Sequence, residues 1–299
     1  MGTRCVASAN QNIKAMNAQR MFILLAVIAM AVSTMRLHAQ ENWTLVFHDE
    51  FDGNEVNWNV WHSEEGFVRN EEYQWYQPQN ARVENGLLLL EGRLDSIPNP
   101  NYRASARDWR SNRSHAKYSS ASINTRGSFS FQYGRMEVRA RIPAVIGSWP
   151  AIWTLGTTMG WPSCGEIDVM EYYHIKGVPH ILANAAWGND YSHQPVWNTK
   201  ITPYSHFLER DPYWGEKFHT WVMDWDEDRL CISLDGEVLN EIDLKTTVNG
   251  RIGRYKNPMQ QPHYILLNLA IGGQNGGEPQ ADAFPMRYEI DYVRVYQKQ

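Results

Sequence analysis

The stretch Arg135-Met136-Glu137-Val138-Arg139-Ala140-Arg141-Ile142 alternates strictly between charged and apolar residues. A period of two is the side-chain period of a β-strand, so one face of this strand meets a core and the other meets water. Similar runs recur at 87–92, 128–131, 230–234, 263–269 and 288–296, and turn signals such as Glu84-Asn85-Gly86 and Asp235-Gly236-Glu237 separate them. Long helical periodicity is absent. The sequence therefore predicts an all-β fold, a β-sandwich or jelly roll.

The first 39 residues differ in composition from the rest of the chain. They carry four basic residues and no acidic one, and they include the apolar run from Met21 to Val32. A basic segment, a short apolar segment and Leu37-His38-Ala39 before Gln40 are typical of a signal peptide that is cut after Ala39. We expect residues 1–39 to be this signal, residues 40–299 to form one domain, and the protein to be exported to the periplasm or beyond the cell. An uncleaved membrane anchor is the alternative.

Charge and cysteine content limit the partners of the exported chain. Loss of the signal segment changes the formal net charge from −5 to −9. An acidic protein is a poor non-specific ligand for nucleic acid or for an anionic membrane, so we expect neither partner. The two cysteines left, Cys164 and Cys231, make no disulfide framework and no zinc site, and we expect two buried free thiols. The protein is expected to be a monomer.

Tryptophan is the residue type that points to a ligand. All 13 Trp residues lie beyond residue 40, with many Tyr residues among them. The flat apolar face of an indole suits the C–H face of a sugar ring, and its N–H donates a hydrogen bond. Some of these side chains must fill the core, but their number favours a carbohydrate-binding protein.

The run Glu166-Ile167-Asp168-Val169-Met170-Glu171 carries the candidate chemistry. On a strand Glu166 and Asp168 share one face, whereas Glu171 has an odd offset that would place it on the other. One inserted residue, a β-bulge near Val169-Met170, restores the phase, and such bulges are common beside active sites. We therefore expect all three carboxylates on one face.

Three adjacent acids repel one another, so at least one should hold a proton near neutral pH. A retaining glycosidase needs this combination, because one carboxylate attacks the anomeric carbon while a protonated partner donates to the leaving oxygen. An acidic strand edge or a calcium site, which uses oxygen ligands, would explain the same residues. In a strand-rich and Trp-rich exported chain we favour catalysis.

These residues resemble the signature of glycoside hydrolase family 16, in the laminarinase-like variant with a bulged Glu-x-Asp-x-x-Glu motif that laminarinases, agarases and carrageenases share. The resemblance extends over nearly all of the chain beyond residue 40. The further motifs, in the expected order, are Phe47-His48-Asp49-Glu50-Phe51, Asn70-Glu71-Glu72-Tyr73-Gln74-Trp75-Tyr76, Tyr133-Gly134-Arg135, Trp149-Pro150-Ala151-Ile152-Trp153, the run 267–273 and the run 291–296. The resemblance implies a β-jelly-roll sandwich of two antiparallel sheets with a concave substrate cleft.

The resemblance also implies roles for individual residues. Glu166 would be the nucleophile, Glu171 the acid/base, and Asp168 would hydrogen-bond Glu166 and tune both. Residues implied to bind substrate are Trp149, Trp153, Trp161, Asn70 and Glu72. Many family members hold a structural calcium ion on the convex side, which would here use Glu50, Asp291 and the carbonyl of Gly86. No cofactor is expected for catalysis.

One region of the chain departs from the laminarinase pattern, and another has two possible interpretations. Where those enzymes carry a His-containing strand, this chain has residues 180–188, in which Trp187 is a further candidate for substrate binding. The insertion from Asn189 to Trp214 follows it. The polar stretch from Asn99 to Lys117 is expected to be a solvated loop, and the alternative is a basic wall that meets anionic groups on a sugar.

Four functions are compatible with these features. The first is endo-hydrolysis of β-1,3 or mixed-linkage β-1,3/1,4-glucan by double displacement. The second keeps this chemistry on a β-galactan such as agar, porphyran or a host O-glycan chain. A non-catalytic sugar-binding jelly roll is the third, and a transglycosylase that uses the same intermediate is the fourth. The retained carboxylate trio argues against the binding module.

Overall fold

The computed structural model describes residues 42–190 and 194–299. Within it, Thr44–Gln297 forms one compact unit. The predicted signal peptide, residues 1–39, lies outside the described residues. Within the described ranges, no helix is both long and apolar enough to span a membrane.

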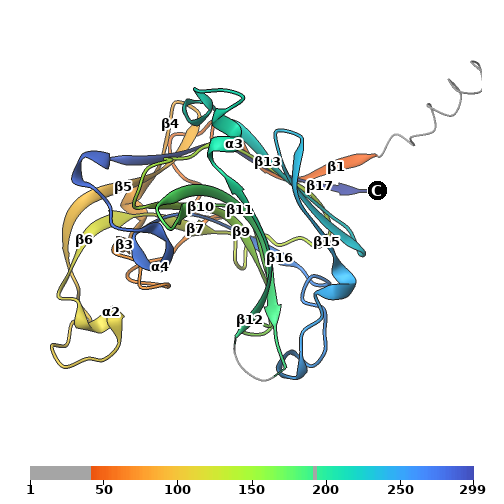
Figure 1. Ribbon diagram of the computed structural model, residues 1–299, viewed down its shortest axis with the longest axis horizontal. Coiled ribbons are helices and arrows are strands. Elements are labelled where there is room, and N and C mark those ends of the chain that lie inside the picture. Colours follow the sequence, from red (N-terminus) through yellow and green to blue (C-terminus); the bar gives the residue numbers. More distant parts are fainter. Residues whose placement is uncertain (1–41, 191–193) are drawn as a thin grey trace, which may run out of the picture. The chain divides into compact units, whose positions relative to one another are not determined.

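Two β-sheets make up most of the unit (Figure 1). The larger sheet has the strand order β15-β14-β13-β8-β17-β5-β6-β3, with β1 beside β17 and β4 beside β5. Its strands are β1 (Trp43–Asp49), β3 (Gln74–Tyr76), β4 (Ala81–Glu84), β5 (Leu87–Pro98), β6 (His115–Ser120), β8 (Gly134–Arg141), β13 (His219–Trp225), β14 (Arg229–Leu234), β15 (Glu237–Asp243) and β17 (Met286–Lys298).

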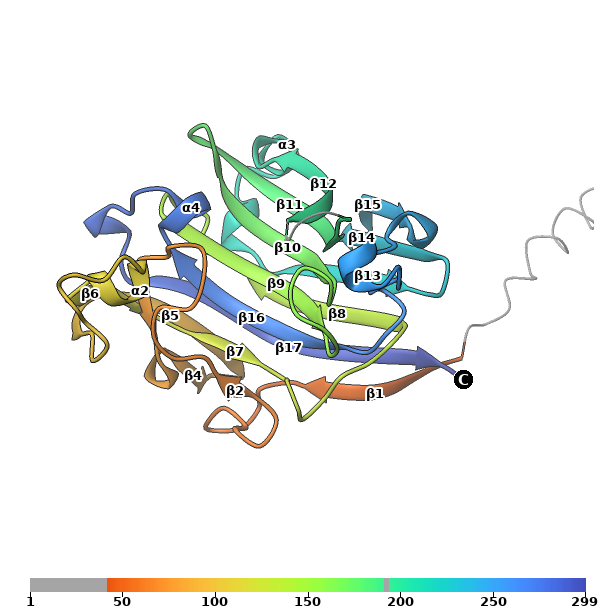
Figure 2. The same cartoon turned by 90° about the horizontal axis from the view of Figure 1, so that it is seen from below.

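The smaller sheet has the strand order β12-β11-β10-β9-β16-β7-β2. Its strands are β2 (His62–Ser63), β7 (Ser122–Asn124), β9 (Ser148–Gly156), β10 (Glu166–Ile175), β11 (Val178–Gly188), β12 (Pro195–Pro203) and β16 (His263–Ile271). Figure 2 shows β16, β9, β10 and β11 side by side. Strands β9, β10, β11, β12 and β16 pair with their neighbours in antiparallel fashion, whereas β3 pairs with β6 in parallel fashion. This arrangement confirms the predicted jelly-roll sandwich of two antiparallel sheets.

Within the described residues, short helices and turns connect the strands. The α-helices are α2 (Trp109–Asn112), α3 (Ser205–Leu208) and α4 (Gly273–Gly276). The 3₁₀ turns are η1 (Pro78–Asn80), η2 (Trp214–Glu216), η3 (Leu244–Thr246), η4 (Arg251–Gly253) and η5 (Ala281–Ala283). Phe207 of α3, Trp214 of η2 and Leu244 of η3 add to the core. Most of the buried apolar side chains in the core nevertheless come from strands of the two sheets.

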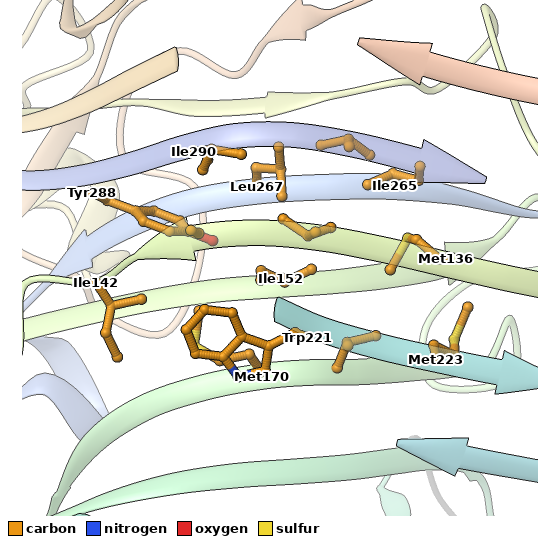
Figure 3. Packing of buried hydrophobic residues seen from close by; sticks show 14 of the residues in the cluster. Met136, Ile142, Ile152, Met170, Trp221, Met223, Ile265, Leu267, Tyr288 and Ile290 are labelled. Atoms are coloured by element: carbon orange, nitrogen blue, oxygen red, sulfur yellow. The ribbon is translucent and has the colours of Figure 1, made fainter. Parts of the chain in front are cut away.

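The hydrophobic core lies between the two sheets (Figure 3). Met136 of β8 and Trp221 of β13 enter it from the larger sheet, while Ile152 of β9 and Met170 of β10 enter it from the smaller one. All four side chains are fully buried. Burial of one such aliphatic side chain contributes about 1.5–3 kcal/mol, so the sandwich is held together mainly by this layer.

The alternation seen in the sequence of β8 is reproduced in its burial. Met136, Val138 and Ala140 are buried, and the residues between them are partly exposed. On the outer face the arginines of β8 pair with acids of the adjoining strands β13 and β17, as Arg135 with Asp224, Arg139 with Asp291 and Arg141 with Glu289. These pairs lie on the solvent side, where a single ion pair adds little stability.

Both predicted turns join neighbouring strands of the larger sheet. Asn85 and Gly86, between β4 and β5, have φ of 54° and 74°. Asp235 and Gly236, between β14 and β15, have φ of 49° and 84°. Two successive positive φ values are typical of the hairpin turn whose twist matches that of the strands, and Asn-Gly and Asp-Gly adopt it most readily.

The cysteine prediction is confirmed in its main point. Cys164 and Cys231 are both free thiols. Cys164 is buried, whereas Cys231 on β14 is only partly buried, because it lies on the outer face of its strand. Burial raises the pKa of the Cys164 thiol to about 11, so this group stays protonated.

The stretch from Asn99 to Lys117 is more ordered than a solvated excursion. It contains α2 and the start of β6, and the Asn99 amide donates to the carbonyls of Arg110 and Arg113. Arg110 donates to the carbonyl of Val68, and Arg113 donates to the carbonyls of Glu71 and Glu72. These two arginines therefore hold the chain before β3 in place and are not a free basic wall.

We predict that Arg113→Ala lowers the free energy of unfolding by about 2 kcal/mol, because hydrogen bonds from a charged donor are lost. Its guanidinium also lies over the rings of Phe67, Tyr73 and Trp109, and this packing disappears as well. Urea unfolding followed by tryptophan fluorescence measures the change. Arg107→Ala, an exposed position in the same segment, is the matched control and should change stability by less than about 0.5 kcal/mol. Equal effects of the two variants would contradict the anchoring role.

Candidate active site

A bulge in β10 brings the three carboxylates onto one face. Asp168 lies opposite Trp153 of β9 and Asn184 of β11, and the register then shifts before Glu171 on both sides of the strand. This confirms the predicted β-bulge. As a result Glu166, Asp168 and Glu171 all line a cleft of about 660 Å³, while the intervening apolar residues 167, 169 and 170 belong to the core.

The cleft is lined by residues of the smaller sheet and of the loops around it. From the strands come Trp149, Ala151, Trp153, Leu155, Glu166, Asp168, Glu171, Tyr173, Asn184, Trp197, Thr199 and Asn268. From the connecting segments come Arg69, Asn70, Glu72, Trp161, Gln274 and Asn275. Apolar rings beside a few polar groups are typical of a binding site for a sugar chain.

Indole and amide N–H groups bind the two outer carboxylates. Trp161 Nε1 donates to Glu166 Oε2 at 2.5 Å, and Trp149 Nε1 donates to Glu171 Oε1 at 2.9 Å. Asn184 Nδ2 donates to the other oxygen of Glu171 at 2.7 Å. Each of these bonds has an ionised acceptor when the carboxyl is charged, which makes it stronger than a bond between neutral groups.

The three carboxyls hold their protons with different strengths. Burial raises the pKa of Glu171 to about 7, aided by the negative charge of Glu166 and opposed by the bonds from Trp149 and Asn184. Burial raises the pKa of Asp168 well above its usual range, and the charges of Glu166 and Glu171 raise it further. Asp168 therefore keeps its proton and donates a hydrogen bond to Glu166. Near neutral pH, Glu171 exists in both protonation states.

Glu166 is the carboxyl with the most support for its charge. Burial raises its pKa above the usual value, but Trp161 and Asp168 both hydrogen-bond it and the Arg69 guanidinium attracts it. A nucleophile must be a charged carboxylate and a general acid must be a neutral carboxyl, and two carboxyls in different environments can meet both needs. The arrangement can thus deliver an electron pair from one end of the motif and a proton from the other.

Three of the predicted tryptophans lie in this cleft. Trp149 and Trp161 bond the carboxylates, and Trp153 donates from Nε1 to Asn268 Oδ1 at 2.7 Å. Trp161 is 47% exposed, which leaves its ring face open to a ligand, whereas Trp149 and Trp153 are largely buried in the cleft floor. Their contacts with sugar stay a prediction.

The predicted pair Asn70 and Glu72 also lies in the cleft wall. Asn70 adopts a left-handed φ of 55°, and its amide approaches Glu72 Oε1 at 3.4 Å. Gln74 donates to the other Glu72 oxygen at 2.7 Å, and burial raises the pKa of Glu72. Glu72 is 2% exposed, and these contacts hold its carboxyl in place.

The structure corrects the prediction for Trp187. Ala183 and Ala185 of β11 point into the core, whereas Asn184 between them lines the cleft. Trp187 lies two residues beyond Ala185 and so faces the same way, and it is 8% exposed. Trp187 is therefore on the side of the strand that faces away from the cleft. The insertion supplies Trp197 of β12 in its place, and this ring lines the cleft and is 43% exposed.

The candidate calcium ligands are engaged in ion pairs. Arg294 donates to both oxygens of Glu50, at 2.8 and 2.7 Å, and Arg139 pairs with Asp291. Gly86 lies in the turn between β4 and β5. Among the residues that the structure describes, no group of three or more His, Cys, Asp or Glu side chains could hold a metal ion. This donor set fits a salt-bridge network rather than a calcium site, and calcium binding stays an untested prediction.

Arg69 and Asn184 are site residues that sequence reasoning missed. The Arg69 guanidinium lies over the rings of Trp153, at 5.1 Å, and Tyr76, and it pairs with Glu64. Arg69 directly precedes Asn70, so its place beside a recognised motif was the available signal. Asn184 lies in the strand that departs from laminarinases, and only the pairing of β10 with β11 shows that it meets the carboxylates.

Comparison with known proteins agrees with this geometry. The sequence profile of Glycosyl hydrolases family 16 matches residues 69–294. A beta-glucanase from Rhodothermus marinus is 29% identical, with 95% of this chain and 96% of that protein covered. Glucan endo-1,3-beta-glucosidase A1 from Niallia circulans is 30% identical over 85% of this chain, which spans 38% of that longer protein.

Solved structures show the same fold. A structure from work on endo-acting O-glycanases, which human gut bacteria express to initiate mucin breakdown, is 34% identical, with a TM-score of 0.76 and 86% and 91% of the two chains covered. The laminarinase catalytic domain from Thermotoga maritima is 30% identical, with a TM-score of 0.69 and 87% and 100% covered. The profile match over most of the chain, together with the carboxylates on the bulged strand, shows that the protein belongs to glycosyl hydrolases family 16 and is a glycoside hydrolase.

Proposed function

We propose that the protein cleaves β-1,3 or mixed-linkage β-1,3/1,4-glucan within the chain, by a double displacement that retains the anomeric configuration. The observation that carries this proposal is the difference between two carboxyls of β10. Hydrogen bonds and the Arg69 charge favour the ionised form of Glu166, whereas Glu171 has a pKa of about 7. The relatives from Rhodothermus marinus and Niallia circulans, both named for glucan cleavage, support the choice of polymer.

The reaction proceeds in two balanced steps. In the first, Glu166 attacks the anomeric carbon, the bond to the leaving oxygen breaks, and Glu171 gives its proton to that oxygen. In the second, Glu171 takes a proton from water, the hydroxide portion bonds to the anomeric carbon, and Glu166 leaves. Asp168 transfers no proton in either step, and it acts through its hydrogen bond to Glu166.

A β-galactan or host O-glycan chain is the second candidate substrate. The structural relative from the mucin O-glycanase work supports it, and so does the name of a relative from Sphingobacterium multivorum, keratan-sulfate endo-1,4-beta-galactosidase. The cleft wall formed by β11 and β12 is where this chain departs from laminarinases, and it presents Asn184, Trp197 and Thr199. A different wall changes which sugar fits while leaving the carboxylates in place.

We also propose that the protein is exported and acts on polymers in the periplasm or outside the cell. The basic and apolar character of residues 1–39 supports this proposal. Fractionation of cells that express the full chain, followed by N-terminal sequencing of the product, tests it. A product that begins at Gln40 in the exported fraction is expected, and a full-length cytoplasmic product would contradict it.

We predict that Glu166→Gln and Glu171→Gln each lower kcat/KM at least ~1,000-fold, because each removes a group that acts in the transition state. Proton NMR of the first products of the wild-type enzyme should show the β-anomer before mutarotation. Circular dichroism controls for folding of the variants. Full turnover by Glu166→Gln, or an α-anomer as first product, would refute the double displacement.

The pH profile of kcat/KM should be bell-shaped, with its alkaline limb near pH 7. Glu171 must be protonated to donate, so activity falls as the pH rises through its pKa of about 7. Activity also falls at low pH, where Glu166 takes up a proton and no longer attacks. Loss of the Trp161 bond raises the pKa of Glu166, so Trp161→Phe should move the acid limb to higher pH. An unchanged acid limb would show that this bond does not support the charge.

Product analysis on laminarin, lichenan, agarose and mucin O-glycans decides the polymer. Ladders of oligosaccharides from laminarin or lichenan are expected for an endo-glucanase. Cleavage of the mucin glycans or agarose with no products from either glucan would establish the second candidate in place of the first. Glu166→Gln assayed on each polymer is the control for contaminating activity.

A further inference from the structure

We propose that Asn184 is the positioning residue for the acid/base group, with one amide that orients Glu171 and ties it to Asp168. The inference rests on the proposed role of Glu171. Asn184 lies in β11 directly opposite Asp168 and is 2% exposed. Its Nδ2 lies 2.7 Å from Glu171 Oε2 and 3.2 Å from Asp168 Oδ2. An amide nitrogen has two hydrogens, so this one group serves both carboxyls.

The orientation of the amide follows from its neighbours. Reversal of the Asn184 side chain would place its carbonyl oxygen against two carboxyl oxygens, which repel it unless both carry protons. In the orientation found, Oδ1 is buried, and no donor among the described residues reaches it. An unpaired buried acceptor is unfavourable, so this oxygen does not explain the orientation of the side chain. Its two donated bonds are the feature that explains its position.

Both oxygens of Glu171 are held as a result. Trp149 Nε1 binds Oε1 from the β9 side, and Asn184 Nδ2 binds Oε2 from the β11 side. Two donors on opposite sides fix the plane of the carboxyl group, so the proton it delivers keeps one direction. Without Asn184 the carboxyl can rotate about its last torsion, and its alignment with the leaving oxygen is lost.

The ionised form of Glu171 is stabilised mainly by its N–H donors, because the charged groups around it are mostly acidic. Among the residues that the structure describes, the titratable or charged groups that line the cleft with Glu171 are Glu166, Asp168 and Tyr173 on β10 and Arg69 and Glu72 before β3. Strands β9, β11, β12 and β16 and helix α4 contribute uncharged cleft residues. The cation of the set, Arg69, pairs with Glu64 and attracts Glu166. Removal of the Asn184 bond should therefore raise the pKa of Glu171, because the ionised form loses a donor.

The test compares Asn184→Ala and Asn184→Asp with the wild-type enzyme on the glycan that the wild type cleaves. We expect kcat to fall at least ~10-fold with a smaller change in KM, since alignment in the transition state is lost. The alkaline limb of kcat/KM should move up by about one pH unit, and further in Asn184→Asp, which adds a like charge. Trp149→Phe, which removes the donor to the other oxygen, should move the limb in the same direction.

Asn240→Ala is the matched control. Asn240 is a buried Asn of β15 that donates to the carbonyl of Ala183 and to Asn198 Oδ1, so it supports β11 from the other side without meeting a carboxylate. Its replacement should lower the melting temperature and leave the alkaline limb where it is. If the alkaline limb of kcat/KM moves equally in Asn240→Ala, or does not move in either Asn184 variant, Asn184 does not position the acid.

The outcome separates this inference from the proposed function. If Glu171→Gln abolishes turnover but the Asn184 variants keep the wild-type pH profile, the function stands and the inference fails. If Glu171→Gln retains full turnover, the assignment of the acid/base fails first. Should an Asn184 variant fold poorly, a ¹³C titration of the Glu171 carboxyl in the isosteric Asn184→Asp protein, at a temperature below its melting point, measures the same pKa directly.

Discussion

One inserted residue in β10 is the constraint on which the active site depends. A regular strand would send Glu171 into the core, where a charged carboxylate without partners is very costly. The register shift between Asp168 and Glu171 instead turns two consecutive residues, Val169 and Met170, into the apolar layer. The strand therefore places apolar side chains in the core and all three carboxylates in the cleft. Its pairing with β9 and with β11 shifts register at the same point.

The crowding of acids that this creates is relieved mainly by neutral donors, together with the attraction of the Arg69 guanidinium for Glu166. Indoles of Trp149 and Trp161 and the amide of Asn184 each bind a carboxyl oxygen. Neutral donors reduce the cost of burial only in part, so Glu171 still keeps a pKa of about 7. A nearby lysine or arginine would lower that value and remove the acid. The site thus needs donors that stabilise the charged form of Glu171 but leave its pKa high enough for the protonated form to be populated near neutral pH.

The cleft wall outside the sheet depends on a second set of contacts. The loop that carries Arg69, Asn70 and Glu72 has no regular structure of its own, and Arg110 and Arg113 bind its carbonyl groups from the segment before β6. Two parts of the chain about 40 residues apart in sequence thereby form one wall. A segment rich in arginine can serve as scaffold for a site instead of contacting the ligand.

The sequence by itself determined the sandwich, the bulge and the grouping of three carboxylates, because alternation and phase are local properties of a strand. Burial along β8 and the register of β10 agree with those predictions. Only the tertiary structure decided that Trp187 faces away from the cleft, that Trp197 and Asn184 line it, and that Glu50 pairs with Arg294. These outcomes depend on which strands pair and in what register. No local pattern encodes such pairing, since it is set by contacts between residues distant in sequence.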